Sequence, residues 1–187
     1  LSLMKNFRLA TQFIDNNKWY SPELRGQELH KKKIGIVGFG RLGKMVAKMC
    51  KSFGMKISAY DKDESINFPD YVKKCSLGIL LRTSDILTIH IPLNNRNKGF
   101  IDKNKIDMMK DDAIIINTSR GDLIDEDYLV ESLIKNKIRG AGLDVISDEG
   151  IAGFDPKDSK IIQFSKNNHN LIITPHIGGA SLDAINK

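Results

Sequence analysis

Short apolar runs alternate with longer amphipathic stretches along most of this 187-residue chain, and this alternation restricts the possible fold more than any other feature. Strands buried on both faces of a parallel sheet form continuous apolar runs, and helices connect them as βαβ units. The expected strands are Lys33–Val37, Met55–Tyr60, Ile86–Ile91, Ala113–Asn117, Gly140–Val145 and Leu171–Thr174. The expected helices are Leu42–Phe53, Leu77–Thr83, Asp102–Met109 and Glu126–Asn136. The sequence therefore predicts an α/β fold around a parallel sheet.

The first 26 residues do not follow this alternation. A helix is expected there, because apolar residues recur at helical spacing at Leu3, Met4, Phe7, Ala10, Phe13 and Ile14. A polar connection that contains Trp19 follows at residues 16–26. One helix cannot bury this stripe by itself, so we expect it to pack on its own domain or on a second copy of the chain. Ser181 to Lys187 have the pattern of the first turns of another helix.

A Gly-x-Gly-x-x-Gly pattern lies between the first expected strand and the helix that follows it. Gly38 permits a tight turn, Gly40 lets the backbone approach a pyrophosphate, and Gly43 allows close packing of helix on sheet. Arg41 and Leu42 begin the helix, whose free N–H groups and positive dipole end attract phosphates. The pattern predicts a Rossmann-type, doubly wound parallel sheet flanked by helices, with a bound dinucleotide.

The second expected strand is followed by Asp61, with 17 residues between Gly43 and this carboxylate. A carboxylate at this place accepts hydrogen bonds from the adenosine ribose and repels a 2′-phosphate, which favours NAD over NADP. Lys62 softens that preference. The alternative is that Asp61 only begins a turn.

The net charge of +6 indicates either a nucleic-acid-binding surface or a lysine-rich solvated surface. Acidic residues are interleaved with the lysines, the only dense basic run is His30 to Lys33, and no aromatic residues are spaced for base stacking. These features favour the solvated surface and no nucleic-acid partner.

Cys50 and Cys75, the only cysteines, lie in no metal-binding or redox spacing, and two cysteines fit a reducing compartment. No apolar run approaches the roughly 20 residues that span a bilayer, and no signal peptide is visible. We therefore expect a cytoplasmic protein with no metal site and no membrane partner.

Three charged residues follow successive apolar strands: Arg120, Glu149 and His176. Ligands of open parallel sheets bind outside the carboxyl ends of the strands, so these side chains are expected to converge over one crevice. Taken singly, each could instead be an ordinary surface or loop residue.

The motifs around these residues resemble those of the D-isomer-specific 2-hydroxyacid dehydrogenase family, which includes phosphoglycerate, lactate, glycerate and formate dehydrogenases. The resemblance runs from about Glu23 to Ser181. Its motifs are residues 24–26, the glycine loop, Asn-Thr-Ser-Arg-Gly at 117–121, Gly-Leu-Asp-Val at 142–145 and Thr-Pro-His-Ile-Gly-Gly at 174–179.

The resemblance implies NAD-dependent hydride transfer between nicotinamide and a D-2-hydroxyacid or 2-oxoacid. Arg120 would bind the substrate carboxylate through its guanidinium fork and polarise the carbonyl. His176 would act as the general acid or base, which suits imidazole near neutral pH. Glu149 would orient the ring and stabilise the imidazolium.

The resemblance also assigns cofactor-binding residues. Asp144 would lie near the nicotinamide ring, and His90, Pro92, Thr118 and Ser119 would line the cofactor groove. Many relatives have Glu at position 147 and Pro at position 150, where this chain has Ser and Gly. The segment 151–170 is longer than is common and contains a short helical pattern.

The implied domain organisation is an NAD-binding domain over residues 1–187, in which residues 1–26 form a leading helix and linker. A substrate domain would be largely absent from this chain, so the chain alone is expected to turn over 2-oxoacids poorly or not at all. The resemblance also implies a homodimer joined through the cofactor domains and the leading helix.

Two other functions stay open at this point. A non-catalytic NAD-sensing module, such as the corepressors that resemble these dehydrogenases, can keep the Arg, Glu and His. A basic nucleic-acid-binding domain on an α/β scaffold is the weaker alternative, and a steep salt dependence of DNA binding would support it.

Overall fold

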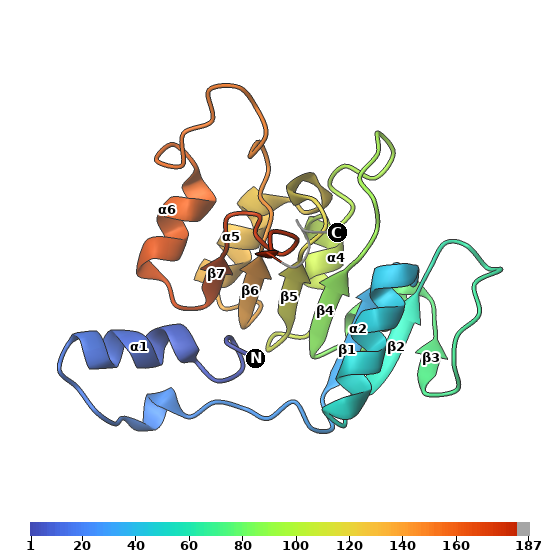
Figure 1. The fold of residues 1–187 in the computed structure, drawn as a ribbon, viewed down its shortest axis with the longest axis horizontal. Coiled ribbons are helices and arrows are strands. Elements are labelled where there is room, and N and C mark those ends of the chain that lie inside the picture. The colour runs from blue at the N-terminus through green and yellow to red at the C-terminus, as the bar shows by residue number, and fades with distance from the viewer. Residues whose placement is uncertain (183–187) are drawn as a thin grey trace.

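Seven strands form one parallel sheet in the computed structural model, which describes residues 1–182 (Figure 1). The strands are β1 Lys33–Val37, β2 Lys56–Tyr60, β3 Val72–Lys74, β4 Ile86–Ile89, β5 Ile114–Asn117, β6 Gly140–Leu143 and β7 Leu171–Ile173. Their order is β3-β2-β1-β4-β5-β6-β7. The chain therefore builds the sheet in one direction from β1 to β3 and in the other from β4 to β7, and the predicted doubly wound sheet is confirmed.

All six expected strands are present, and three of them end one or two residues earlier than expected. The residues just past these ends stay tied to the sheet. The amide of His90 donates to the carbonyl of Val37 at 2.7 Å, and that of Asp144 donates to the carbonyl of Asn117 at 2.9 Å. These backbone bonds fix the directions in which the loops leave the sheet.

Strand β3 at the sheet edge was not expected from the sequence. It is three residues long, and only Val72, which pairs with Ile57, is buried. Its other two residues are exposed lysines. The apolar run that marks the inner strands is therefore missing, and neighbouring β2 supplies the hydrogen bonds that hold β3 extended.

Helices cover both faces of the sheet. They are α1 Phe7–Asp15, α2 Arg41–Ser52, α3 Leu77–Thr83, α4 Lys103–Asp107, α5 Glu126–Ile134 and α6 Lys160–Asn167, with 3-10 helices η1 Pro22–Leu24 and η2 Gly121–Leu123. Figure 1 shows α2 in front of the sheet, and α4 and α5 behind it. Side chains at the N-caps of α4, α5 and α6 accept backbone N–H bonds and fix where these helices begin; they are Asp102, Asp125 and Ser159.

Two apolar clusters lie on opposite faces of the sheet, because successive strand residues point to opposite sides. Ile34 and Ile36 belong to the cluster beneath α2, whereas Val37 belongs to the cluster beneath α3, α4 and α5. Gly43 and Ala47 are the buried residues of α2. The glycine loop between β1 and α2 is therefore anchored on both sides by buried packing.

The leading helix begins at Phe7, four residues later than the apolar pattern predicts. Asn6 adopts a left-handed conformation, with φ of 49°, which interrupts the helix before that point. Met4 is buried in the cluster beneath α2, and the Arg8 guanidinium donates to the Leu171 carbonyl at 2.9 Å. The segment thus docks on its own domain but leaves much of its apolar stripe uncovered. Most of the helix expected at Ser181 to Lys187 lies outside the described residues.

Candidate active site

The glycine loop lies where the sheet changes its winding direction, between the ends of β1 and β4. Gly38 has φ of +90°, and a Cβ there would lie 2.6 Å from the His90 carbonyl oxygen. A Cβ on Gly43 would lie 2.2 Å from the Gly38 carbonyl oxygen. A Cβ on Gly40 would meet no atom within 4 Å. The first and third glycines are therefore required by the fold itself, and the second leaves open space at the beginning of α2.

A cavity of about 940 Å³ opens beside this loop. Five of the residues predicted to bind the cofactor line it: Gly38, Gly40, Asp61, His90 and Pro92. The cavity volume, the open space at Gly40 and the free N–H groups at the start of α2 fit the pyrophosphate of a dinucleotide. Arg41 and Leu42 are exposed at that helix end, and Gly43 is buried.

Asp61 supports the glycine loop directly. Its Oδ2 accepts a hydrogen bond from the Phe39 amide at 2.6 Å, and its Oδ1 accepts one from the Asp63 amide at 3.0 Å. A carboxylate oxygen can accept more than one hydrogen bond, so both oxygens can still accept from ribose hydroxyls. Asp61 therefore fits the predicted function of ribose binding and also holds the phosphate loop in shape.

His90 is a poor candidate for the general acid. Its Nε2 lies 3.0 Å from the Thr88 hydroxyl, and its Nδ1 is buried without a hydrogen-bond partner among the described residues. Burial lowers the pKa of His90, so the neutral ring is favoured. This is consistent with the predicted position in the wall of the groove.

Thr118, Ser119 and Arg120 lie on the loop after β5. The Asn117 side chain braces this loop by donating to the Arg120 carbonyl at 2.8 Å and accepting from the Ser119 amide at 3.0 Å. The Ser119 hydroxyl donates to the Ile89 carbonyl at 2.8 Å, which ties the loop to β4. The Arg120 guanidinium is exposed and donates to the Ser119 carbonyl. Within residues 1–182, no hydrogen bond or ion pair joins Arg120 to Glu149 or His176.

Glu149 and His176 form a direct pair. His176 Nδ1 lies 2.8 Å from Glu149 Oε1, and the other carboxylate oxygen accepts a hydrogen bond from the Ile146 amide at 3.3 Å. About half of the His176 side chain is exposed, compared with a quarter of Glu149. Since Nδ1 is held by the carboxylate, the opposite ring nitrogen is left for a ligand. This is the geometry of a general acid whose ring is oriented by a carboxylate.

Asp144 holds the turn that carries His176. Its Oδ1 accepts from the Thr174 hydroxyl at 2.5 Å and the Ile177 amide at 3.0 Å, and its Oδ2 accepts from the Gly178 amide at 2.7 Å. Burial acts to raise the pKa of Asp144, but these hydrogen bonds outweigh it and lower the pKa. They also hold His176 in a left-handed conformation, with φ of 54°. The sequence predicted Asp144 as a cofactor residue but did not predict its bond to Thr174.

Replacing Asp144 by asparagine is expected to lower the free energy of unfolding by about 1–3 kcal/mol at neutral pH, because a carboxamide cannot accept all three hydrogen bonds. The folded-state pKa of Asp144 is depressed, so its stabilisation is present above the ordinary value of 3.8 and is lost as pH falls through the folded pKa. Urea denaturation at several pH values checks this. The difference in the free energy of unfolding between wild type and Asp144→Asn should become smaller in acid. A difference that does not change with pH would contradict this mechanism.

The loop that carries Glu149 is anchored from α5. The Glu126 carboxylate accepts a hydrogen bond from the Ser147 amide at 2.6 Å, and burial raises the pKa of Glu126. An apolar cavity of about 560 Å³ lies beside the Glu149–His176 pair, between this loop and α6. The helical pattern expected within residues 151–170 is present as α6. The segment therefore shapes the surroundings of the pair.

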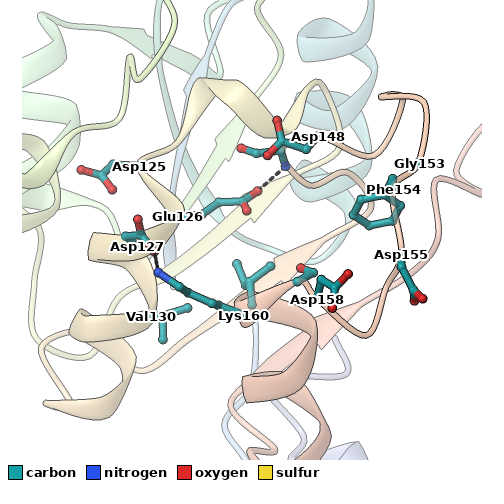
Figure 2. Close-up of a pocket in the computed structure, with 13 residues that line it drawn as sticks. Asp125, Glu126, Asp127, Val130, Asp148, Gly153, Phe154, Asp155, Asp158 and Lys160 are labelled. Carbon is teal, nitrogen blue, oxygen red and sulfur yellow. Dashed lines mark hydrogen bonds and ion pairs between the residues drawn. The ribbon is translucent and has the colours of Figure 1, made fainter.

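A third large cavity, of about 520 Å³, has six acidic residues and one lysine in its lining (Figure 2). Lys160 lies 3.6 Å from Asp127 and neutralises part of this charge. Among the described residues, no group of three or more His, Cys, Asp or Glu is arranged to hold a metal ion. The negative potential opposes dinucleotides and organic acids, so we assign neither ligand to this cavity. Its aspartates are Asp125, Asp127, Asp148, Asp155 and Asp158.

The sequence matches the family model for the D-isomer specific 2-hydroxyacid dehydrogenase NAD binding domain over residues 1–178. The chain is 37% identical to hydroxypyruvate reductase of Thermotoga maritima over 186 residues, which cover 98% of this chain and 58% of that protein. It is 35% identical to D-3-phosphoglycerate dehydrogenase of Methanocaldococcus jannaschii over 192 residues, which cover 98% of this chain and 34% of that protein.

The fold is also shared with a solved relative, D-lactate dehydrogenase from Aquifex aeolicus in complex with NAD and lactic acid. The TM-score is 0.90 at 30% identity, over 99% of this chain and 58% of that chain. The chain thus spans about a third to three fifths of the length of these three relatives. Because the family model matches nearly the whole sequence, and the glycine loop has the geometry it requires, the chain belongs to the D-isomer specific 2-hydroxyacid dehydrogenase family and contains its NAD-binding domain.

Proposed function

We propose that this chain is the cofactor domain of an enzyme that reduces 2-oxoacids to D-2-hydroxyacids, and catalyses the reverse reaction, with NAD(H). The observation that carries the proposal is the Glu149–His176 pair at 2.8 Å, just past the carboxyl ends of β6 and β7. Ligands of doubly wound sheets bind at this edge. The relatives named above are enzymes, which favours catalysis over the non-catalytic NAD-sensing alternative.

Each charged residue of the site has a separate task in this proposal. The bound cofactor supplies or accepts the hydride. The exposed Arg120 guanidinium binds the substrate carboxylate through two parallel hydrogen bonds. His176 gives a proton to the carbonyl oxygen during reduction and takes it back during oxidation, and Glu149 stabilises the imidazolium. Thr118 and Ser119 line the cofactor groove, and Asp144 keeps His176 in place near the nicotinamide.

We propose that activity also requires a second, substrate-binding domain, as in the organisation expected from the sequence. Two observations support this. The chain covers 58% of the hydroxypyruvate reductase relative, and half of the His176 side chain is exposed. A second domain would exclude water from the site during hydride transfer. The chain by itself is therefore expected to reduce 2-oxoacids poorly or not at all.

The test of cofactor binding is a calorimetric titration of the chain with NADH, with Asp61→Ala as the variant. Binding of NADH that Asp61→Ala weakens, while the melting temperature stays close to that of wild type, would support the proposal. Asp15→Ala, on the leading helix, is a control for the loss of one carboxylate. An absence of NADH binding to the wild-type chain would contradict cofactor binding by this domain on its own.

We also propose a homodimer in which the leading segment contacts a second copy. Five large apolar side chains of this segment are largely exposed: Leu1, Phe7, Ile14, Trp19 and Tyr20. A second exposed apolar stripe runs along α2, at Leu42, Met45, Met49 and Phe53. Exposed apolar side chains that gather on one element are typical of protein–protein contacts. Within residues 1–182, no helix is long and apolar enough to cross a membrane. The cytoplasmic location stays a prediction.

The combined change Phe7→Glu and Trp19→Glu is expected to weaken the dimer at least about 100-fold, since burying either carboxylate costs more than the lost apolar contact alone. Sedimentation equilibrium over a range of concentrations measures the change in dissociation constant. Gln12→Glu adds the same kind of charge to the other side of α1 and should leave the dimer intact. A monomeric wild-type chain would refute the homodimer.

A further inference from the structure

The adenosine end of the cofactor groove carries more positive than negative charge. Asp61, Lys62 and Arg96 are the charged residues that line the 940 Å³ cavity. Asp61 follows β2, where a carboxylate of this fold contacts the adenosine ribose. Lys62 is its direct neighbour, and Arg96 reaches the same cavity from the loop after β4. Two cations and one carboxylate therefore line the cavity in which the ribose is expected.

The Asp61 carboxylate is less repulsive to an anion than an unpartnered carboxylate would be. Its two oxygens accept hydrogen bonds from the Phe39 and Asp63 amides at 2.6 and 3.0 Å. Backbone N–H dipoles that point at a carboxylate offset part of its charge. An acidic residue at this position usually repels a 2′-phosphate, and these hydrogen bonds weaken that repulsion in this chain.

Neither cation is used elsewhere in the fold. Within residues 1–182, Lys62 and Arg96 make no ion pair, whereas Lys98 on the same loop lies 3.3 Å from Asp122. Both side chains are exposed at the groove and free to bind a ligand. An Arg near the ribose is the usual means by which this fold accommodates a 2′-phosphate.

The loop conformation holds the Arg96 backbone in place. The Asn94 carboxamide oxygen accepts from the Arg96 amide at 2.9 Å, and the Asn97 carboxamide oxygen accepts from the Asn94 amide at 2.7 Å. The Asn97 side chain also donates to the Pro92 carbonyl at 2.7 Å. These side-chain bonds close a compact turn against the groove, so less backbone entropy is lost when Arg96 binds an anion.

We propose that Lys62 and Arg96 form a subsite for the 2′-phosphate of NADP(H), so that this domain binds both dinucleotides. The inference rests on the proposed binding of NADH in the same groove. The expected affinity for NADPH lies within about tenfold of that for NADH, because two charge-assisted contacts to phosphate offset the repulsion from Asp61. Without the two cations, the carboxylate alone would favour NADH strongly.

Two simple probes isolate the 2′-phosphate from the rest of the cofactor. Adenosine 2′,5′-bisphosphate and adenosine 5′-monophosphate differ only by that group, so the ratio of their affinities measures the subsite directly. Calorimetry gives both affinities, and NADH and NADPH are titrated in the same way. The variants are Lys62→Ala and Arg96→Ala. Lys98→Ala is the control, since it removes a cation from the same loop but outside the groove lining.

The expected result is that wild type binds the 2′,5′-bisphosphate at least as tightly as the monophosphate. Each alanine variant should lower the bisphosphate affinity about three- to tenfold while changing monophosphate affinity less than twofold. Arg96→Lys should recover part of the loss. Added KCl should weaken the bisphosphate more than the monophosphate, because exposed charges are screened.

Three outcomes would overturn the inference. A wild-type preference for NADH over NADPH clearly above about tenfold would show that Asp61 dominates. If the alanine variants lost equal affinity for the bisphosphate and the monophosphate, the two cations would bind the 5′-phosphate or pyrophosphate instead of the 2′-phosphate. An effect of Lys98→Ala as large as that of Arg96→Ala would mean that only net charge matters. If neither NADH nor NADPH binds wild type, the proposed cofactor binding itself fails, and that result is distinct from the other three.

Discussion

Gly40→Ala is expected to reduce NADH affinity about 100-fold or more while leaving the chain folded. The structure separates these effects because a Cβ at Gly40 meets no atom within 4 Å. The backbone there is extended, with φ of −73° and ψ of −157°, so the position does not need the positive φ that favours glycine. The added methyl group occupies the space through which a pyrophosphate reaches the beginning of α2. An overpacked contact of this kind costs up to about 3 kcal/mol, and a cost of this size corresponds to the expected loss of NADH affinity.

Two other glycines provide the controls for this result. Gly150→Ala adds the same methyl group in open space outside the cofactor groove, and should change neither NADH affinity nor folding. Gly43→Ala should destabilise the chain, because its Cβ would lie 2.2 Å from the Gly38 carbonyl oxygen. Calorimetry with NADH and thermal unfolding of each variant separate the cases. Unchanged NADH binding by Gly40→Ala would mean that the pyrophosphate does not approach this residue.

The inner sheet could be predicted from the sequence because its signal is local. Each inner strand is buried on both faces and is therefore an uninterrupted apolar run, as in Ile114 to Ile116. The glycine spacing is likewise local, and the geometry at Gly38 and Gly43 shows why it is required. Fold class and cofactor loop follow from short stretches of sequence with few competing interpretations.

What could not be predicted depends on contacts between distant segments. The edge strand β3 is held by β2 rather than by its own residues. The bond between Thr174 and Asp144 joins residues 30 positions apart, and neither residue alone indicates it. The leading helix starts late because of the backbone at Asn6, which an apolar pattern does not reveal.

The candidate site could likewise be predicted only in part from the sequence. The pairing of Glu149 with His176 was expected from the family resemblance, and the two side chains do lie within contact distance. Arg120 was expected to converge with them, but its contact in this domain is with the Ser119 carbonyl. A long exposed side chain takes its final position only when its ligand is present. Arg96 could not be singled out from the sequence, because its place in the groove depends on the turn formed by Asn94 and Asn97.

His176→Gln is expected to lower kcat for 2-oxoacid reduction about 1,000-fold in the two-domain enzyme that the proposed function requires. The glutamine side chain can still donate a hydrogen bond, but it cannot transfer a proton to the carbonyl oxygen, and positioned general acids contribute about 10²–10⁴-fold. Affinity for NADH should fall far less than kcat, because His176 is not in the lining of the cavity where the adenosine end of the cofactor is expected. Stopped-flow reduction and NADH titration measure the two quantities separately.

Glu149→Gln is expected to cost less, about 10–100-fold in kcat, because it removes the charge that stabilises the imidazolium and leaves the acid in place. Glu149 acts through His176, to which it is bound at 2.8 Å. The double variant should therefore be no slower than His176→Gln alone, since the carboxylate has no other route to the substrate. Effects that multiply in the double variant would show that Glu149 contacts the substrate independently. Such a result would mean that Glu149 and His176 do not act as a pair, and the main support for this catalytic site would be lost.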